Sequence, residues 1–491
     1  MSEHWHQLGL AAYRAGRYAE AADLIGRAIE ADGRIAGYHA NRGTALKAAG
    51  QLEPAIACYR TALRLEPVAP VVWSNLGNAL RELGRPDEAA LPGMAAACLA
   101  PDTAEILFNL ANTWQALRRL EPAIALFDRA IRLKPGFAAA QGNMGLALQQ
   151  DGRIEAALAR YDAALALTPD DALVHFNRAT ARLLRGDLAV AWADYEWRWR
   201  CGFKTQRPRN FPQARWSGET IAGRTVLLHA EQGLGDTLLL CRYAPLVAAR
   251  GAKVLLEVQP ALVPLLVGLA GVAAVFATGD PLPAFDNHCP LASLPAAFAT
   301  DRASIPANVP YLKADPGRID RWRPRLPEAC LRIGIVWAGS PAFDANQRRS
   351  APLAAFAPLA ARAGMRLISL QKHHGLDQLE RLPAGMVVER LGDDLDADGA
   401  FLDTAAVMTT LDLVVGIDSA ATQLAGALGV PVWVALDTEP HWPAGQTGER
   451  HPWYPTMRLF RQTRRGDWSA VFDRIAAAIS ILPQGSRPSR G

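Results

Sequence analysis

Cysteine is scarce in this sequence, which has six in 491 residues and no Cys-x-x-Cys pair. The six are widely spaced: Cys58, Cys98, Cys201, Cys241, Cys289 and Cys330. Such spacing disfavours a structural zinc site or a disulfide framework and indicates free thiols in a reducing compartment. The first residues, MSEHWHQLGL, also lack the charged-then-apolar order of a secretory signal. We therefore expect a cytoplasmic protein.

An excess of one charge and long apolar runs are also lacking. The net charge is only +4, and the basic residues are scattered, so nothing favours a nucleic-acid partner. One nearly uncharged stretch, 260–279, has the length of a membrane span. Pro264, Gly268 and Gly271 interrupt it, and a buried helix followed by a strand at 272–277 explains it better. We expect no transmembrane segment.

Residues 1 to about 200 repeat with a period of 34. Small residues recur at fixed positions, where they let two antiparallel helices approach closely, and prolines end the second helices. The registers include Gly9, Gly43, Gly77, Ala111, Gly145 and Ala179; Ala21, Ala55, Ala89, Ala123, Ala157 and Ala191; and Pro67, Pro101, Pro135 and Pro169. The pattern resembles six copies of the tetratricopeptide repeat (TPR). The third copy is irregular, with Pro92-Gly93 inside its second helix.

Asparagine fills another register of the repeats: Asn41, Asn75, Asn109, Asn143 and Asn177. In a TPR superhelix this position lies on the first helix and faces the concave groove. A row of amide side chains could hold an extended peptide backbone whatever its sequence, which predicts a protein partner in the groove. Asparagine is also common at this place in TPRs, so a purely structural row is the alternative.

The sixth copy ends in DYEWRWR, residues 194–200, where three aromatic residues alternate with charged ones. This pattern predicts a capping face that docks onto the next domain. Residues 201–223 are rich in Pro, Arg and Gly and are typical of a linker packed along the surface.

From Thr225 onward the pattern predicts strands alternating with helices or loops. The expected strands are 225–229, 252–258, 272–277, 331–339, 365–370, 386–391, 412–417 and 430–436, and a last helix is expected at 468–482. Two such series indicate two Rossmann-like α/β domains facing a cleft. The predicted fold class is thus an α-solenoid followed by an α/β body. Its domains are a TPR array (1–200), a linker (201–223), two α/β domains (224–327 and 328–483) and a tail (484–491).

A glycine-rich loop follows the first of these strands: Glu231, Gln232, Gly233, Leu234, Gly235 and Asp236. The two glycines let the backbone turn tightly and approach a ligand, and a helix is expected at 237–250. Asp236 then lies at the helix start, where it can cap the helix or act on a substrate hydroxyl. With Glu257, the two glycines also fit part of a dinucleotide-binding fingerprint, but Leu238 occupies the third glycine's place.

A second candidate site follows the strand at 412–417. Asp418 or Ser419 would cap the next helix, whose free N–H groups and positive dipole end suit a diphosphate. A plain capped helix is the alternative.

Several segments together resemble glycosyltransferase family 9, the heptosyltransferase-like enzymes of the GT-B fold, in the bacterial branch that carries N-terminal TPRs. They are EQGLGD, HCPLASLP, PYL, GIVWAGSP with Arg349-Ser350 after it, SLQK, DTAAV and IDSAATQLAGALGVPVWV. Their order and spacing, over about 210–480, carry the resemblance.

The resemblance implies inverting, metal-independent transfer of a sugar from a nucleotide-diphosphate donor to a hydroxyl of a protein or glycan acceptor. Asp236 matches the family's loop aspartate and is the expected general base. The donor site would comprise Arg349, Ser350, Lys372, Asp418, Ser419, Thr422 and Gln423, and the acceptor loop Glu231, Gln232, Gly233 and Gly235. The nucleotide sugar is a co-substrate, and we expect no other cofactor.

Two segments depart from the family pattern. Gln423 stands where the family has a histidine, and an amide cannot act as a cationic partner for phosphate. The Trp/Arg-rich segment before PWYP is altered to EPHWPAG, which contains His441 and Trp442. The alternative function is therefore a TPR interaction scaffold whose glycosyltransferase body only binds.

Two further patterns could hold a metal. Asp396-Ala397-Asp398 has the form of a metal-binding Asp-x-Asp, but it follows Asp393 and Asp394, which favours a solvated acidic loop. His373-His374 has no acidic or cysteine neighbour at ligand spacing and is expected on the surface. We expect no metal site.

Overall fold

The computed structural model describes residues 1–203, 208–328, 330–341, 344–361 and 364–480. The chain divides into two compact units, Met1–Val174 and His175–Gly491, which are described separately here. The sixth helix pair, α11 (Ala172–Arg185) and α12 (Leu188–Tyr195), thus falls almost wholly in the second unit. The tail expected at 484–491 lies outside the described residues.

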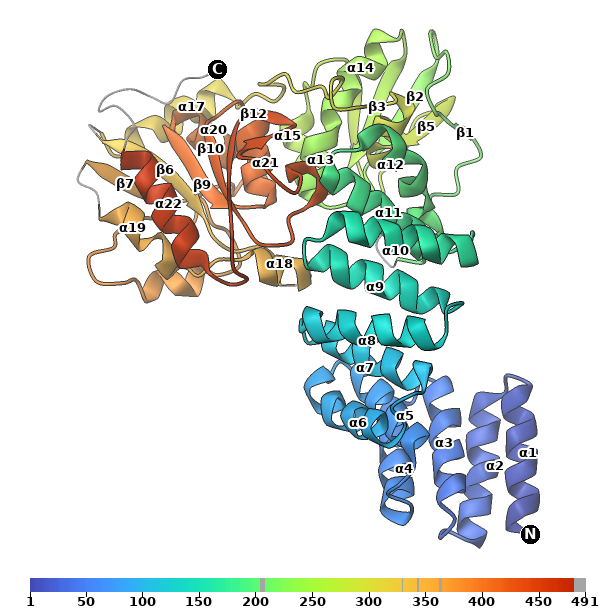
Figure 1. The fold of residues 1–491 in the computed structure, drawn as a ribbon. Coiled ribbons are helices and arrows are strands. Elements are labelled where there is room, and N and C mark those ends of the chain that lie inside the picture. The colour runs from blue at the N-terminus through green and yellow to red at the C-terminus, as the bar shows by residue number, and fades with distance from the viewer. Residues whose placement is uncertain (204–207, 329, 342–343, 362–363, 481–491) are drawn as a thin grey trace. The chain divides into compact units, whose positions relative to one another are not determined.

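The first unit is a stack of helix pairs in chain order (Figure 1). Its helices are α1 (Ser2–Arg14), α2 (Tyr18–Ala31), α3 (Ala36–Ala48), α4 (Leu52–Leu65), α5 (Pro70–Glu82), α6 (Pro86–Leu99), α7 (Ala104–Ala116), α8 (Leu120–Leu133), α9 (Ala138–Gln150) and α10 (Ile154–Leu167). Pro92 lies inside α6, which continues through it.

The small residues allow the close helix contacts that the registers predict. A Cβ added at Gly43 would lie 2.8 Å from the ring of Tyr59, and one at Gly145 only 2.6 Å from the ring of Tyr161. Both tyrosine rings are fully buried, so a larger residue at either glycine would push its helix pair apart.

The second unit begins with α11, α12 and the short 3-10 helix η1 (Glu196–Arg200). Asp194 joins the two α-helices, because its carboxylate accepts hydrogen bonds from Arg178 (2.7 Å) and Arg182 (2.8 Å). The docking face predicted for 194–200 is confirmed, since Arg198 is fully buried and contacts the α/β residues that follow.

The first sheet is entirely parallel, in the order β1-β5-β2-β3-β4. Its strands are β1 (Ala214–Arg215), β2 (Thr225–His229), β3 (Lys253–Val258), β4 (Val272–Ala277) and β5 (Asn287–Pro290), with α13 (Leu234–Leu240), η2 (Cys241–Tyr243), α14 (Ala244–Ala249), η3 (Pro260–Leu262), α15 (Val263–Leu266), η4 (Leu291–Ser293), α16 (Leu294–Ala297), α17 (Pro316–Trp322) and η5 (Arg323–Arg325). The sequence predicted β2, β3 and β4. It missed β5, whose four residues, all buried, show no alternation.

The prediction of one continuous helix over 237–250 is wrong. The chain forms α13 from Leu234, then the 3-10 turn η2, then α14. Pro245 explains the break, because its ring would clash with the carbonyl group of Cys241 in a continuous helix.

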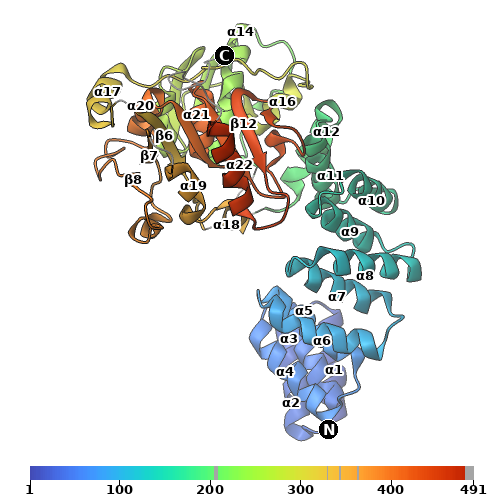
Figure 2. The same ribbon diagram turned by 60° about the vertical axis from the view of Figure 1, so that its left-hand side comes forward.

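The second sheet has the order β11-β12-β10-β9-β6-β7-β8 and is parallel except for β11 on β12. Its strands are β6 (Leu331–Val336), β7 (Met365–Ser369), β8 (Val388–Glu389), β9 (Leu413–Ile417), β10 (Val432–Leu436), β11 (Arg450–His451) and β12 (Tyr454–Arg461), with α18 (Asp344–Arg349), η6 (Leu353–Phe356), α19 (Ala357–Ala360), η7 (Leu376–Glu380), α20 (Leu402–Thr410), α21 (Ala420–Ala427), η8 (Trp442–Ala444) and α22 (Trp468–Ser480). The strand expected at 386–391 shrinks to β8, and β12 was not predicted. Helix α22 packs on β10 and β12 (Figure 2).

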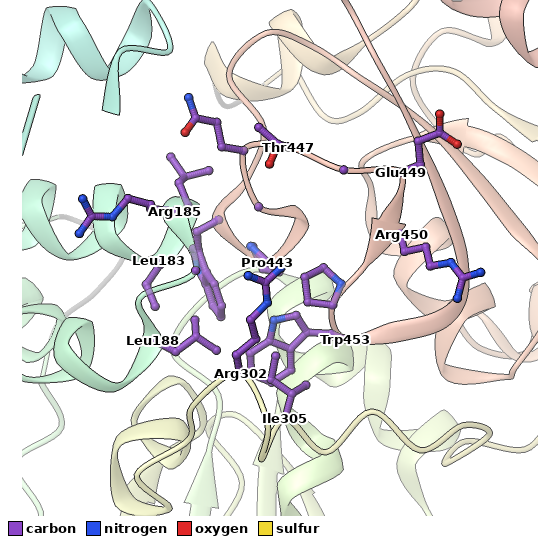
Figure 3. Close-up of a pocket in the computed structure, with 17 residues that line it drawn as sticks. Leu183, Arg185, Leu188, Arg302, Ile305, Pro443, Thr447, Glu449, Arg450 and Trp453 are labelled. Carbon is purple, nitrogen blue, oxygen red and sulfur yellow. The ribbon is translucent and has the colours of Figure 1, made fainter. Parts of the chain in front are cut away.

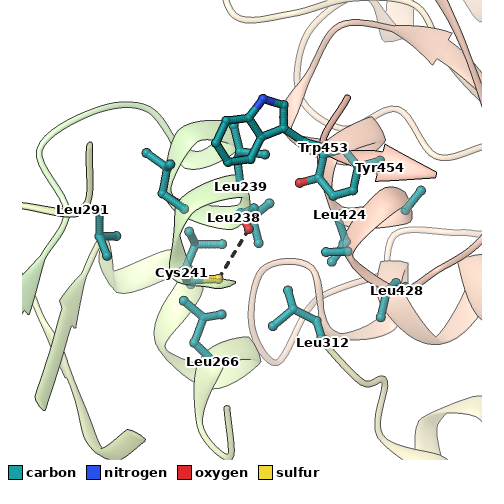
Figure 4. Packing of buried hydrophobic residues seen from close by; sticks show 14 of the residues in the cluster. Leu238, Leu239, Cys241, Leu266, Leu291, Leu312, Leu424, Leu428, Trp453 and Tyr454 are labelled. Atoms are coloured by element: carbon teal, nitrogen blue, oxygen red, sulfur yellow. Dashed lines mark hydrogen bonds between the residues drawn. The ribbon is translucent and has the colours of Figure 1, made fainter. Parts of the chain in front are cut away.

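The two sheets meet where α13 packs against α21 (Figure 4). Leu238 and Leu239 lie opposite Leu424 and Tyr454 in one buried cluster. Next to it, the buried guanidinium of Arg242 donates to the carbonyl oxygens of Leu239 (2.8 Å), Pro306 (3.1 Å) and Trp453 (2.6 Å). It also donates to the Tyr311 hydroxyl and lies over the Tyr454 ring, 4.4 Å from its centroid. One cation thus bonds to residues of both halves.

The uncharged stretch 260–279 folds as η3, α15 and β4, as its prolines and glycines predict. Across the described ranges, the structure contains no helix with both the length and the apolar character needed to span a bilayer.

Candidate functional site

The two predicted loops meet at the carboxyl ends of parallel strands. Strand β2 leads into the loop 231–236, and β9 leads into 418–419, where α21 begins. A Cβ added at Gly235 would lie 3.6 Å from Gln423 and 3.7 Å from the Cα atom of Ala420. The first turn of α13 therefore contacts the first turn of α21, which is the position where α/β proteins bind ligands.

Asp236 lies in the first turn of α13, and its Oδ2 atom accepts a hydrogen bond from the backbone N–H of Gly233 (3.2 Å). Its side chain keeps 23% of its surface exposed. The Oδ1 atom lies 3.8 Å from Nε2 of His441, which precedes η8 in the second half. Asp236 is thus both the predicted helix cap and an accessible carboxylate beside an imidazole.

Burial lowers the pKa of His441, and the negative charge of Asp236 opposes that shift. The shift favours the neutral imidazole, which can accept a proton or a hydrogen bond. The sequence analysis noted His441 only as a departure from the family pattern and assigned it no role. Its pairing with Asp236 depends on how the two halves pack, so no local pattern could have revealed it.

Asp418 follows β9 and faces two other predicted residues. Its Oδ1 atom accepts a hydrogen bond from Gln423 (3.3 Å), and its Oδ2 atom lies 3.8 Å from Nη1 of Arg349. Among the described residues, three buried atoms of this group have no hydrogen-bond partner: Asp418 Oδ2, Gln423 Oε1 and Arg349 Nε. Because buried polar groups are nearly always paired, these atoms are available to a ligand or to water.

Asp437, at the end of β10, extends this group. It is buried, its Oδ1 atom lacks a hydrogen-bond partner, and its Oδ2 atom lies 3.5 Å from Nη1 of Arg348. Burial raises its pKa to about 6, against the lowering effect of Arg348 and Arg349. The sequence analysis missed Asp437, although an acidic residue directly after a buried strand was a usable signal.

The remaining donor-site predictions fall into two groups. Ser419 caps α21 in a reciprocal capping box with Thr422, which confirms the predicted cap. Ser350 and Lys372 instead bond to the protein itself. The Ser350 hydroxyl donates to the carbonyl of Asn346 (2.6 Å) and accepts from the N–H of Gly339, and Lys372 donates to the carbonyl of Leu395.

The first two residues of the acceptor loop also point into the protein. The Glu231 side chain is 5% exposed and accepts hydrogen bonds from Arg198 and from the N–H of Ala292, both at 3.2 Å. The Gln232 amide donates to the hydroxyl of Tyr195 (2.7 Å). Burial raises the pKa of Glu231 to about 7, although Arg198 acts in the opposite direction.

The asparagine register lies on the first helices of successive repeats, and all five side chains are half-buried. Asn41 contacts His6 (2.9 Å), Asn109 donates to Ser74 (2.9 Å) and Asn143 donates to Asn112 (2.7 Å). These bonds connect neighbouring repeats, which gives Asn41, Asn109 and Asn143 a structural role.

Two acidic residues of the alternative metal and dinucleotide patterns, Asp396 and Glu257, have structural roles. The solvated-loop interpretation is wrong for Asp396, which is 9% exposed and accepts hydrogen bonds from the N–H groups of Asp403 and Thr404. Glu257 is buried and paired with Arg209. His373 and His374 are exposed, as expected. In the part of the chain that the structure describes, no three His, Cys, Asp or Glu side chains are grouped to hold a metal.

A cavity of about 320 Å³ lies beside the segment that follows His441, with Trp442 and Pro443 in its lining (Figure 3). Its walls come from the α11–α12 turn, the loop at 302–305 and residues 442–453. Leu188, Ile305 and Trp453 line it, and Arg302 extends into its centre (Figure 3).

Comparison with known proteins supports the repeats. The TPR repeat model matches residues 43–84 and 150–186, and a second tetratricopeptide repeat model matches 104–137. The N-terminal region therefore consists of TPR repeats, which indicate a protein-interaction scaffold. Protein FlbA of Caulobacter vibrioides is 29% identical over 324 residues, which cover 61% of this chain and 54% of that protein. The chain thus spans about half the length of this relative.

Solved structures are similar to parts of this chain. PilF of Pseudomonas aeruginosa is 21% identical with a TM-score of 0.37, over 41% of this chain and 91% of that one. YrrB, described as a TPR protein with an unusual peptide-binding site, is 21% identical with a TM-score of 0.31, over 36% and 92%. MamA of Desulfovibrio magneticus RS-1 is 17% identical with a TM-score of 0.33, over 35% and 96%.

Replacing Glu231 should change how stability depends on pH. The folded pKa is raised from 4.5 to about 7, so between these values the folded protein holds a proton that the unfolded chain has lost. Glu231 therefore makes the second unit less stable as pH rises through this range, by on the order of 1–3 kcal/mol, with no further change above it. Glu231→Gln should lack this decrease in urea unfolding at pH 4.5 to 8. A stability difference between the two proteins that is constant across that range would contradict the assignment.

Proposed function

We propose that the second unit is an inverting glycosyltransferase of the GT-B type, which moves a sugar from a nucleotide-diphosphate donor to a hydroxyl. The observation that carries the proposal is that Gly235, the neighbour of Asp236, contacts Gln423 and Ala420 beside the Asp418–Arg349 pair, at the carboxyl ends of parallel strands from both sheets. The segments that resemble glycosyltransferase family 9 include both loops. The TPR repeats would recruit the protein partner or substrate.

In the proposed reaction Asp236 is the general base. It takes the proton of the acceptor hydroxyl while the acceptor oxygen forms a bond to the anomeric carbon. The bond from that carbon to the diphosphate breaks on the opposite face, and the nucleotide leaves with the electron pair. His441 can accept a hydrogen bond and lies beside the carboxylate that gains the proton. The reaction needs no metal ion or cofactor.

The unpaired atoms support a ligand with two kinds of polar group. Asp418, Gln423 and Asp437 each have a buried acceptor oxygen without a donor, which the hydroxyls of a donor sugar would supply. Arg349 and the N-terminus of α21 offer cationic and N–H partners for the departing diphosphate. Gln423 contributes as a neutral amide, so Arg349 carries the positive charge.

Asp236→Asn should separate chemistry from binding. The amide keeps the size of the side chain but cannot take a proton. We expect turnover to fall roughly 10²-fold while affinity for the donor stays nearly unchanged. Transfer should be assayed over a panel of nucleotide sugars, with donor affinity measured in parallel. The matched variant Arg349→Ala should lose donor affinity first. Transfer by Asp236→Asn at the parent rate would show that another group is the base.

A second candidate function is a TPR scaffold whose α/β body binds without turnover. Gln423 favours it, because its neutral amide cannot act as a cationic partner for a phosphate. Absence of transfer from every donor, together with retained nucleotide binding, would support this function over the first.

The asparagine row gives a separate test of partner binding. Replacing Asn75, Asn109 and Asn143 together by alanine should weaken binding of a protein partner by about 1 kcal/mol for each hydrogen bond lost. Asn78→Ala is the matched control, because Asn78 lies in α5 with Asn75 but outside the register. The affinity of a captured partner for each variant is the measurement, and circular dichroism checks the fold. Equal affinity for parent and triple variant would favour the structural role.

A further inference from the structure

Helix α12 and the turn η1 touch both segments that carry the candidate acid–base pair. Tyr195 and Arg198 bond to the loop that leads to Asp236, and Trp192 and Tyr195 pack on Trp442, the neighbour of His441. These contacts all lie within the second unit. We refer to Trp192 and Tyr195 of α12, together with Arg198 of η1, as the α12 bracket.

On the loop side, the bracket holds two consecutive residues. Arg198 is fully buried and donates to Glu231 (3.2 Å), to the Ser293 hydroxyl (2.6 Å) and to Glu196 (2.7 Å). The hydroxyl of Tyr195 accepts a hydrogen bond from Gln232 (2.7 Å). Both bonded loop residues precede the first turn of α13, so they fix where that turn begins.

On the opposite side, the bracket holds η8 through aromatic rings. Trp192 and Tyr195 meet Trp442 edge to face, with centroids 5.8 and 6.4 Å apart. The Trp192 indole N–H donates to the carbonyl oxygen of Thr300 (2.7 Å), which fixes its orientation. Trp442 is buried and directly follows His441.

We propose that the α12 bracket consists of positioning residues that hold Asp236 opposite His441; this proposal rests on the glycosyltransferase function proposed above. The 3.8 Å between Asp236 and His441 is slightly beyond hydrogen-bond length, so a small shift of either segment decides whether they bond. The last helix of the repeat series thus positions the site through the loop and touches no reacting atom.

Two substitutions test the bracket. Tyr195→Phe removes only the hydroxyl that Gln232 uses and keeps the ring against Trp442. Arg198→Lys keeps the charge but loses most of the forked hydrogen bonding. Trp197→Phe is the matched control, because Trp197 lies in the same turn and its ring stacks on His175 of α11, 4.0 Å away.

Hydrogen exchange gives a readout that does not depend on activity. In Tyr195→Phe, the backbone amides of 232–237 should exchange about five-fold faster, while those of β2 and β3 and the melting temperature stay as in the parent. Trp197→Phe should leave the loop unchanged. Unchanged loop exchange in both Tyr195→Phe and Arg198→Lys would overturn the proposal.

Steady-state kinetics separates positioning from general packing. The bracket variants should lower kcat about ten-fold with the KM for the donor nearly unchanged, because the donor residues lie in the other half of the site. A rise in KM alone, or equal loss in the control, would overturn the positioning role. If the parent transfers no sugar, the proposed function fails, and faster loop exchange then shows only that α12 holds the loop.

Discussion

The buried Arg242 guanidinium is the interaction on which the geometry of the second unit most depends. Its partners are three backbone carbonyls, a phenol and aromatic faces, so its charge is compensated by dipoles and π-systems. It follows α13, whose first turn carries Asp236, and it bonds to Trp453 in the segment after His441. The cation therefore fixes the separation of two catalytic candidates that lie on different halves of the body.

Buried polar atoms gather where α13 and α21 meet. A Cβ at Gly235 would lie 3.6 Å from Gln423, and among the described residues, buried oxygens of Asp418, Gln423 and Asp437 have no hydrogen-bond donor. Such a cluster is costly to fold unless a ligand or water completes it. The two halves are joined here by packed side chains of α13 and α21.

The sequence predicted the repeats and most strands because both depend on local periodicity. The 34-residue registers follow directly from the contacts of Gly43 and Gly145, and β2, β3 and β9 are mostly buried runs of ordinary length. Elements whose pattern is weak, such as β5 and β12, were missed.

The site was predictable only where a residue follows a strand or begins a helix, as for Asp236, Asp418 and Ser419. The role of His441, the burial of Glu231 and the engagement of Lys372 by the Leu395 carbonyl depend on tertiary packing. Asp236 and His441 are 205 positions apart (441 − 236), so no short sequence window contains both. Asp437 directly follows a buried strand, as Asp418 does, so the same reasoning could have identified it.

Retention of a nucleoside diphosphate tests the central claim most directly. Native mass spectrometry of the full chain with a panel of nucleoside diphosphates should show one of them bound at a one-to-one ratio, and Arg349→Ala should lose that complex. We expect one nucleoside diphosphate to bind selectively, with a dissociation constant in the micromolar to millimolar range that is typical of enzyme co-substrates. No binding of any nucleoside diphosphate at millimolar concentration, or equal binding by Arg349→Ala, would contradict it.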